Sequence, residues 1–342
     1  MRIWFNQWFS TAYHLIELMR AGSPGKFTFV GSSTNPNALY RLVSDEWYTE
    51  PALPVSEEYV EYCLEFCKAQ HIDVFFPRRG LTLLSRYRED FRAAGTILAA
   101  GSDYRIMRLL DDKAATYAFF EARDETLVPA HLVAGTYEEF TAAYETLRPH
   151  CTRVCYKLTK DEGAESFRVI DDTLLRSGDV RRKPGMKLTW DMARTVVRGY
   201  DFSVPFMLMP YLEGQEISVD CLWTEKEPII IPRFKTNHRY SEIRFDEEIV
   251  EKCRRIMELL QIRVPINIQF KGDGEKYCLL EINARMSGGL QLSCLATGIN
   301  VPDIALCALL GEERPWQYPD RSKVYRVANL ETPKRLAVEG GA

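Results

Sequence analysis

Ile266-Asn267-Ile268-Gln269-Phe270 is followed, after a polar turn, by Leu279-Leu280-Glu281-Ile282-Asn283-Ala284-Arg285. These two β-rich runs, joined through Gly272-Asp273-Gly274, predict a hairpin. Alternation along the second run places Glu281, Asn283 and Arg285 on one face. Carboxylate and amide oxygens suit Mg²⁺, which proteins hold with few side chains plus nucleotide phosphates, and the arginine suits an anionic substrate group. The hairpin therefore indicates phosphate chemistry, and the alternative is an ordinary solvated strand face.

The composition is that of a globular protein with a substantial core. The chain has 342 residues, of which 46% are hydrophobic and 12% aromatic. This length favours two or three domains. The formal net charge is −4, and the basic residues are scattered instead of gathered in one block. We therefore expect no nucleic-acid partner.

The nine cysteines form no Cys-x-x-Cys pair, and the five histidines are scattered. A disulfide framework or a zinc site is therefore disfavoured, and we expect reduced cysteines that lie mostly in the core. The N-terminal residues lack the apolar segment of a signal peptide, and no apolar run approaches the length of a membrane span. We predict a cytoplasmic protein that does not act at a membrane.

The first hundred residues alternate strand and helix signals, which predicts a doubly wound parallel α/β domain over residues 1–102. No glycine-rich dinucleotide fingerprint follows the first strand, so nicotinamide binding is disfavoured. Ligands of such folds bind at the carboxyl ends of the strands. The candidates to line a substrate crevice there are Asn6, Ser10, Ser32, Ser33, Arg78 and Arg79. For the two arginines, a surface position is the alternative.

From Asp103 onward the pattern indicates α+β structure. We expect a second domain over residues 103–205, a third over 206–315 and a tail over 316–342. The expected helices span 106–121, 137–147, 191–198, 247–260 and 301–310, and the expected strands span 128–133, 154–158, 206–209, 216–223 and 229–234. Within the first domain a helix is expected over 81–94.

Two lysines are notable for their positions. Lys113 follows Asp112 at the start of the helix after the first domain, where a solvated surface position would be ordinary. Lys157 stands in the middle of the apolar run Val154-Cys155-Tyr156-Lys157-Leu158. An unpaired buried charge costs several kcal/mol, so a lysine in this apolar strand indicates that its charge has a partner or a function.

Two further motifs lie between Lys157 and the hairpin. The loop Thr159 to Ser166 is polar and contains one glycine, Gly163, beside acidic residues. The second motif is the strand, turn and strand Met207-Leu208-Met209-Pro210-Tyr211-Leu212-Glu213-Gly214-Gln215-Glu216. Its Tyr-Leu-x-Gly-x-Glu spacing is more specific than a plain hairpin requires. A basic segment, Pro232 to Arg239, follows it.

The order of these motifs resembles the ATP-grasp enzymes, closest in style to the carboxylate-activating halves of the carbamoyl-phosphate synthase large subunit and their amine-ligase relatives. The resemblance runs from Arg2 to about Gly311. It implies a pre-ATP-grasp domain followed by a two-lobed ATP-grasp domain. It also implies ATP and Mg²⁺ as cofactors, with Mn²⁺ as an alternative ion. The loop Thr159 to Ser166 corresponds to the family's phosphate flap but is poorer in glycine, which weakens the expectation of backbone–phosphate contacts.

The resemblance also implies roles for individual residues. Lys113 and Lys157 would contact the nucleotide phosphates; backbone groups of Met209, Pro210, Tyr211 and Leu212 would meet the adenine, with Met209 and Leu280 against its face; and Glu216 would accept from the ribose. Gln269, Glu281 and Asn283 would bind the metal. Arg233 and Lys235 are candidates for the γ-phosphate, and Arg285 for the substrate carboxylate and the developing oxyanion.

The implied reaction activates a small-molecule carboxylate as an acyl phosphate and joins it to an amine, with release of ADP and phosphate. Homodimers are common in the family, which makes a homodimer one possible assembly, although the sequence itself does not determine the oligomeric state. Two alternatives remain at this point: a kinase of the same fold that phosphorylates a small molecule, and a nucleotide-binding regulatory protein without catalysis.

Overall fold

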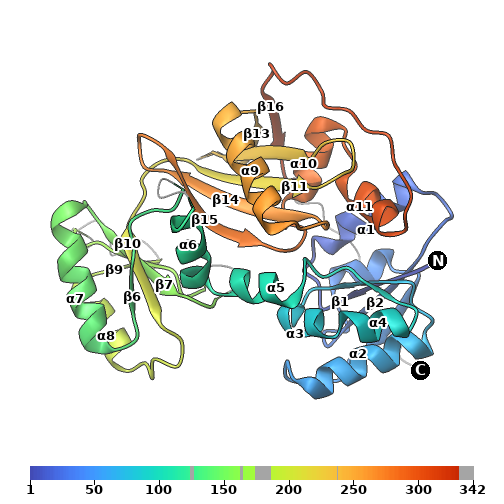
Figure 1. Cartoon of the computed structure of the whole chain (residues 1–342), viewed down its shortest axis with the longest axis horizontal. Coiled ribbons are helices and arrows are strands. Elements are labelled where there is room, and N and C mark those ends of the chain that lie inside the picture. The colour runs from blue at the N-terminus through green and yellow to red at the C-terminus, as the bar shows by residue number, and fades with distance from the viewer. Residues whose placement is uncertain (124–126, 162–164, 174–185, 237, 331–342) are drawn as a thin grey trace. The chain divides into compact units, whose positions relative to one another are not determined.

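The computed structural model describes the chain except residues 124–126, 162–164, 174–185, 237 and 331–342 (Figure 1). Its contacts divide the chain into two compact units. Unit 1 comprises Met1–Arg108, Gln215–Gln269 and Ile282–Ala342, and unit 2 comprises Leu109–Gly214 and Phe270–Glu281. The chain thus changes unit repeatedly, whereas the domain boundaries expected after residues 102, 205 and 315 stay predictions.

The N-terminal part of unit 1 is a parallel sheet with strand order β3-β2-β1-β4-β5 and helices in the connections, which confirms the doubly wound domain (Figure 1). Alternate residues of β1 face two apolar clusters: Ile3 and Phe5 join one, and Trp4 joins the other. The strands are β1 (Arg2–Asn6), β2 (Thr28–Ser33), β3 (Glu46–Thr49), β4 (Val74–Pro77) and β5 (Ile97–Leu98), and the helices are α1 (Ala12–Gly22), η1 (Leu39–Val43), α2 (Glu57–Ala69), α3 (Leu81–Arg86) and α4 (Arg88–Ala93).

The prediction of one helix over 81–94 is wrong in one respect, because the structure has two separate helices there, α3 and α4. Tyr87 between them takes a non-helical conformation, with φ −102° and ψ 20°. Arg88 then donates to the carbonyls of Leu98 and Ser102, each at 2.9 Å. The break lets this arginine tie the helix pair to the chain that follows β5.

The strand order creates a switch point at β1. The chain passes from β1 to its neighbour β2 and later to β4, which lies on the other side of β1. In register, Asn6 at the end of β1 pairs with Ser32 on one side and Pro77 on the other. The loops after β1 and β4 therefore flank the place where open α/β sheets bind ligands.

A second sheet has the order β15-β14-β11-β12-β13-β16; it belongs to unit 1 except for residues Phe270–Glu281, which are counted in unit 2. The expected hairpin is confirmed as the neighbouring strands β14 and β15. The strands are β11 (Glu216–Leu222), β12 (Ile229–Lys235), β13 (Tyr240–Ile243), β14 (Ile266–Gly272), β15 (Tyr277–Asn283) and β16 (Tyr325–Ala328), and the helices are α9 (Glu247–Leu260), α10 (Leu290–Thr297) and α11 (Val301–Leu309). Helix α10 was not expected from the sequence.

Unit 2 contains the sheet β6-β10-β7-β8-β9 and an apolar core around Phe140, Tyr156 and Phe206. The strands are β6 (Leu132–Ala134), β7 (Val154–Leu158), β8 (Arg168–Ile170), β9 (Lys187–Leu188) and β10 (Phe206–Pro210), and the helices are α6 (Lys113–Glu121), α7 (Tyr137–Leu147), η2 (Arg148–His150) and α8 (Trp190–Arg198). Helix α5 (Tyr104–Asp111) spans the boundary between the units.

Two expectations in this unit are corrected. The helix expected over 106–121 is two helices, because Asp112 is extended and its carboxylate caps α6 by accepting from the N–H groups of Ala114 and Ala115. The strand expected over 128–133 is only β6 (Leu132–Ala134). Pro129 has no N–H to give to a sheet, so pairing begins after it.

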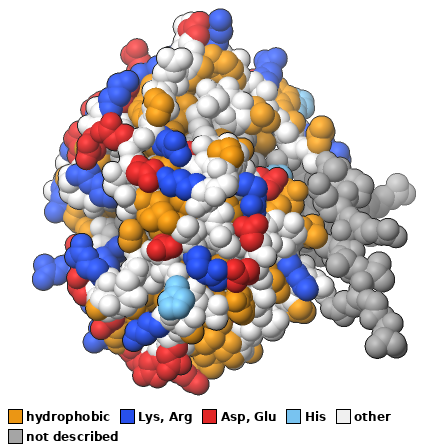
Figure 2. Space-filling model, turned by 90° about the vertical axis from the view of Figure 1, so that its right-hand side faces the viewer, with side chains coloured by type: hydrophobic (Ala, Val, Ile, Leu, Met, Phe, Trp, Pro, Cys, Tyr) orange, Lys and Arg blue, Asp and Glu red, His pale blue; other side chains and the backbone are white. Residues whose placement is uncertain are grey.

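Among the described residues, no single helix has the length and hydropathy to cross a membrane, and only α10 and α11 taken together meet those criteria, as a pair bent by 104°. Acidic and basic side chains are interspersed over the described surface that faces the viewer in Figure 2. The described surface in that view therefore shows no extended tract of one charge.

Helices α1 and α11 meet closely within unit 1 (Figure 1). Asp303 of α11 is buried and accepts a hydrogen bond from Ser23 Oγ at 2.6 Å, and Arg314 Nε lies 3.4 Å from its carboxylate. Gly22, at the end of α1, lies against this carboxylate, because a Cβ there would stand 2.4 Å from Asp303 Oδ2. The absence of a side chain at residue 22 therefore permits the helix contact.

We expect Gly22→Ala to destabilise the protein although alanine is the better helix former. The added methyl group would displace Asp303 from Ser23 and Arg314, at a cost of about 1–3 kcal/mol. Gly199→Ala is the matched control, since its Cβ would meet its nearest neighbour at 3.7 Å. Chemical denaturation of both variants tests this expectation, and equal stability of Gly22→Ala and wild type would contradict the packing described.

Candidate functional site

Unit 2 buries two lysines near each other. Lys157 lies in β7 opposite Met207 of β10, and Lys113 is the first residue of α6. Each is only 8% exposed. Lys157 Nζ donates to the carbonyl of Leu280 at 3.2 Å, and Lys113 Nζ donates to the carbonyl of Asp161 at 2.6 Å. Both ammonium groups are thus held by backbone carbonyls, which leaves further donor capacity on each.

The electrostatics of this pair favour an anionic ligand. Burial lowers the pKa of Lys157 to about 8; the carboxylate of Glu281 opposes this shift, and the charge of Lys113 adds to it. Two cations therefore share a site from which much of the water has been removed. A phosphate group placed between them would restore the charged form of Lys157 and relieve the repulsion.

Tyr117 fixes the strand segment to which Lys157 binds. Its side chain is fully buried, and its hydroxyl lies 2.9 Å from the carbonyl of Leu279 and 3.0 Å from that of Leu280. Burial raises the pKa of this phenol, so it remains a hydrogen-bond donor at neutral pH. Tyr117 was not among the residues predicted from the sequence, although its position four residues after Lys113 in one helix was a usable signal.

The loop predicted to be the phosphate flap is described in part. Lys113 N–H donates to the carbonyl of Thr159 at 2.8 Å, so the start of the loop is tied to the start of α6. Ser166 Oγ accepts from Leu158 N–H at 2.8 Å and also bonds to Asp161. The single glycine, Gly163, lies outside the described residues. The two ends of the loop are therefore fixed beside Lys113.

The predicted adenine hinge runs from the end of β10. Met209, Pro210 and Leu212 are apolar and largely buried. Tyr211 N–H donates to the carbonyl of Arg153 at 2.8 Å, and the Tyr211 ring lies under the cations of Arg153 and Lys271, at 4.6 and 4.1 Å. Because the N–H group of Tyr211 is already used, its carbonyl and its ring are the groups that a ligand could contact.

In unit 1, the structure pairs two residues that the resemblance predicted to have separate roles. Glu216 begins β11 and Lys235 ends the neighbouring antiparallel β12, and their side chains form an ion pair. Both side chains remain partly exposed. A ribose hydroxyl at Glu216 and a phosphate at Lys235 would therefore act on one charge pair.

Arg233 belongs to a buried polar network around Asp220, which is 2% exposed. Arg233 Nη2 donates to Ser218 Oγ at 3.0 Å, and its Nε lies 3.9 Å from Asp220. The Asp220 carboxylate also accepts from Ser287, Ser293 and Asn267, at 2.6, 2.6 and 3.0 Å. The guanidinium packs on Gly289, where a Cβ would stand 2.4 Å from Nη2.

This network holds the segment that follows Arg285. The sequence contained a signal for it, because Glu216, Ser218 and Asp220 alternate on one face of an otherwise apolar strand. Arg233 was a predicted candidate for contact with the γ-phosphate. The structure shows Arg233 buried against Gly289, with no hydrogen-bond acceptor for its Nε among the described residues.

The predicted metal ligands lie on neighbouring strands of one sheet, Gln269 on β14 and Glu281 and Asn283 on β15. All three are partly exposed, while Ile268, Phe270 and Ile282 beside them are buried. Gln269 Nε2 donates to Asn267 at 3.2 Å, which leaves its carbonyl oxygen as a potential ligand. Among the described residues, no group of three or more His, Cys, Asp or Glu side chains could hold a metal. This oxygen-rich set with one carboxylate fits Mg²⁺ that is also bound by phosphates.

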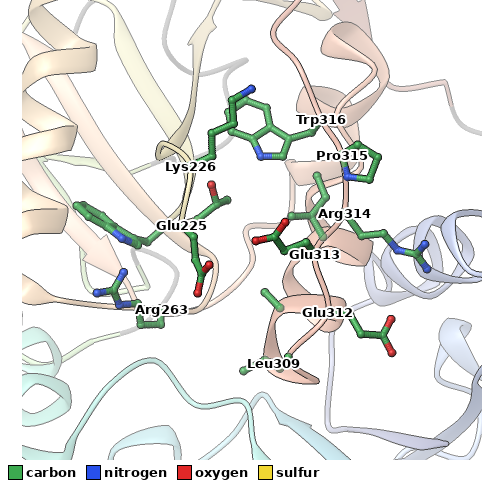
Figure 3. Close-up of a pocket in the computed structure, with 14 residues that line it drawn as sticks. Glu225, Lys226, Arg263, Leu309, Glu312, Glu313, Arg314, Pro315 and Trp316 are labelled. Carbon is green, nitrogen blue, oxygen red and sulfur yellow. The ribbon is translucent and has the colours of Figure 1, made fainter.

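A large pocket of about 1070 Å³ lies elsewhere in unit 1 (Figure 3). Its walls include Trp223, which directly follows β11, and Lys226, which precedes β12. Glu216 and Lys235 lie at the other ends of these strands, roughly 20 Å away at about 3.3 Å per residue. The pocket is therefore separate from the candidate site.

Comparisons with known proteins agree with these motifs. Residues 202–333 match the family model described as "ATP-grasp in the biosynthetic pathway with Ter operon". The carbamoyl phosphate synthase large chain of Agathobacter rectalis is 26% identical over 165 residues, which cover 41% of this chain and 15% of that protein. The chain thus spans less than a fifth of the curated relative that it matches.

Solved structures share the fold. N5-carboxyaminoimidazole synthetase from Staphylococcus aureus, complexed with ADP, has a TM-score of 0.69 at 13% identity, with 96% of this chain and 82% of that chain covered. The biotin carboxylase domain dimer of Hydrogenobacter thermophilus 2-oxoglutarate carboxylase, with MgADP, ADP and bicarbonate, has a TM-score of 0.66 at 14% identity, with 93% and 71% covered. At these identities the likeness establishes the fold.

We expect Lys157→Met to stabilise the unliganded protein by about 1–3 kcal/mol, because methionine fills similar space without a buried charge. Since the folded-state pKa of Lys157 is about 8, below its ordinary value of 10.5, the charge penalty is present below pH 8 and disappears as the pH rises toward 10.5.

Denaturation at pH 7 and pH 10 measures this difference. The gain should be large at pH 7 and small at pH 10. Lys160→Met, at a lysine that is 54% exposed, is the control and should change stability little at either pH. Destabilisation by Lys157→Met at pH 7 would show that the buried ammonium contributes net stability.

Proposed function

Since the chain belongs to the ATP-grasp superfamily, we propose that it is an ATP-dependent ligase that activates a small-molecule carboxylate and joins it to an amine. In the first step, the carboxylate oxygen attacks the γ-phosphorus of ATP, which gives an acyl phosphate and ADP. The amine then attacks the acyl carbon, phosphate leaves, and the amine loses a proton to solvent. The chain positions the reactants and neutralises charge more than it takes part covalently.

The observation that carries this proposal is the buried pair Lys113 and Lys157. Two ammonium groups at 8% exposure, of which one has a pKa lowered to about 8, are poorly balanced in the absence of a ligand. A polyanion compensates both. The same pair argues against a scaffold role, because a protein that does not bind phosphates gains nothing from burying them.

Gln269, Glu281 and Asn283 are the proposed Mg²⁺ ligands. When bound, Mg²⁺ would neutralise phosphate charge. These three side chains do not complete the coordination of Mg²⁺ without phosphate oxygens, so metal binding is coupled to nucleotide binding. The hinge from Met209 to Leu212, together with Leu280, would contact the adenine, and Glu216 the ribose.

Arg285 is the proposed holder of the substrate carboxylate and of the oxyanion that develops at the acyl carbon. The Asp220 network positions the segment after it, including Ser287 and Gly289. Arg233 and Lys235 remain proposals for contact with the γ-phosphate; for Arg233 this would require its guanidinium to leave Gly289. A homodimer is proposed on the grounds that the Hydrogenobacter thermophilus structure is a dimer.

The first test is ADP release with Mg²⁺ and ATP against pools of carboxylates, each with and without a pool of amines. We expect release that needs both pools. Glu281→Gln should reduce it by about 100-fold or more through the loss of charge stabilisation. Glu251→Gln, at a side chain that is 75% exposed, is the matched control and should behave as wild type.

Other outcomes would overturn the proposal in defined ways. Phosphate transfer to a hydroxyl compound without an amine would identify a kinase, and nucleotide binding without ADP release in any pool would identify a regulatory protein. Release unaffected by Glu281→Gln would remove this residue from the metal site.

The affinity for ATP should also depend on pH. Because Lys157 must be charged to bind phosphate and its pKa is about 8 without ligand, affinity should fall by roughly tenfold per pH unit above pH 8. Titration calorimetry at pH 7, 8 and 9 measures this. In Lys157→Arg the side chain stays charged at all these pH values, so the affinity for ATP should fall less as the pH rises. An unchanged fall in affinity would assign the titration to another group.

A further inference from the structure

The pocket of about 1070 Å³ in unit 1 is lined by two tryptophans from different parts of the chain (Figure 3). Trp223 follows β11, and Trp316 lies in the segment after α11. Helix α11 itself contributes Ile304, Ala308 and Leu309. All of these residues belong to unit 1. The volume reaches the upper end of the range for small-molecule sites, and the wall is partly aromatic and apolar, as in such sites.

The wall formed by the segment after α11 is held in place at several points. Arg314 Nε lies 3.4 Å from the carboxylate of Asp303, and its guanidinium is directed away from the pocket (Figure 3). Trp316 packs edge-on against Tyr318, with the ring centroids 5.1 Å apart. Tyr318 Oη in turn accepts from Ile230 N–H of β12 at 2.8 Å. The pocket is therefore formed before any ligand arrives, which lowers the entropic cost of binding.

Charged side chains also line the pocket, and two of them are balanced outside it. Glu312 pairs with Lys26, and Arg314 pairs with Asp303. The charged residues that remain are Glu225, Glu313, Lys226 and Arg263. None of these four forms an ion pair with another described residue. The pocket therefore presents two charges of each sign to whatever enters it.

The two cations lie beside the tryptophans. Lys226 Nζ is 5.9 Å from the Trp316 ring centroid, and the guanidinium carbon of Arg263 is 5.1 Å from that of Trp223. The carboxylates come from different walls, Glu225 from the connection between β11 and β12 and Glu313 from the segment after α11 (Figure 3). A ligand of one charge would match only half of these groups. A ligand with an ammonium group, a carboxylate and an apolar body matches both signs and the rings.

We propose that this cavity, which we call the tryptophan pocket, binds a zwitterion with apolar side chains, namely an amino acid or a short peptide. Arg263 pairs with the carboxylate of the ligand, because a planar guanidinium engages both carboxylate oxygens. Glu225 and Glu313 accept hydrogen bonds from its ammonium group. The indole rings of Trp223 and Trp316 cover its apolar side chains.

The tryptophan pocket is a second site, apart from the candidate site. Strands β11 and β12 run between the two, since Glu216 begins β11 and Trp223 follows its last residue. The zwitterion therefore binds away from the proposed phosphate chemistry, which suits an effector and not a reactant. This inference does not depend on the proposed function.

The test is titration calorimetry of the full chain against leucine, leucyl-leucine and leucyl-leucyl-leucine, each compared with its N-acetyl and its C-terminal amide derivative. We expect at least one uncapped member to bind about tenfold or more tightly than both of its capped forms, because each cap removes one charge. The corresponding glycine compounds, which lack apolar side chains, should bind more weakly. The length series distinguishes an amino acid from a peptide as the ligand.

Arg263→Gln should reduce the affinity for the preferred ligand to that of its amide, and the double variant Glu225→Gln, Glu313→Gln should reduce it to that of the N-acetyl form. These three side chains are exposed, so the variants should fold as wild type does. Arg321→Gln is the matched control. Its guanidinium carbon also lies beside aromatic rings, 5.0 Å from Tyr318 and 5.3 Å from Phe245, but it does not line the pocket. This variant should bind the ligand as wild type does.

Equal binding of capped and uncapped compounds would overturn the proposal, as would no binding of any member at millimolar concentration. A preference for the uncapped form that survives in both folded variants would also overturn it. Saturating ATP and Mg²⁺ should leave binding intact, whereas displacement by ATP would assign the ligand to the candidate site instead. None of these measurements uses ADP release, so the tryptophan pocket and the proposed ligase can fail separately.

Discussion

The burial of Lys113 and Lys157 is the constraint on which the rest of unit 2 depends. To hold two ammonium groups close together, the fold directs the carbonyls of Leu280 and Asp161 at them. Tyr117 in turn donates to the same carbonyl of Leu280. Helix α6, strand β7 and the segment of β15 are therefore joined through polar contacts as well as apolar ones. Burying two ammonium groups in this way costs stability in the unliganded protein.

Unit 1 also buries a charged group, the carboxylate of Asp220. Asp220 accepts from three side chains on β14, on α10 and in the segment before α10, while Arg233 lies close by. One strand residue thereby determines where the chain runs after Arg285. The predicted metal ligands Glu281 and Asn283 adjoin this segment in sequence. The Asp220 network is hence the link between the sheet and the groups that would meet the substrate.

Much of the fold could be read from the sequence, because the apolar periodicity is strong where helices and strands are long. Helix α9 and the hairpin of β14 and β15 lie where the pattern predicts them. The misses have local causes: Asp112 caps a new helix instead of continuing one, and Pro129 delays a strand. Helix α10 has only eight residues, and its buried side mixes Leu290 and Leu292 with Ser293 and Thr297, so no helical period of apolar residues marks it in the sequence.

The candidate site was predictable in its members more than in its contacts. Spacing singled out Lys157, Glu216 and Glu281, because each is a polar residue in an apolar strand. The ion pair of Glu216 with Lys235 and the approach of Arg78 and Arg285 to the one ring of Phe9 depend on which loops the topology brings together. Such pairings have no local signature in a single sequence.

The division of the chain into units has a consequence for how the protein is made. The chain passes between the units four times, and unit 2 is completed only by residues 270–281. Leu279 N–H, which bonds to the carbonyl of Leu127 at 2.7 Å, and the acceptor for Lys157 both lie in that late segment. During synthesis, residues 109–214 therefore emerge from the ribosome without these partners, and Lys157 lacks its Leu280 acceptor until β15 has been made. Unit 2 therefore closes only after residue 281 has been made, while unit 1 still needs the residues that follow.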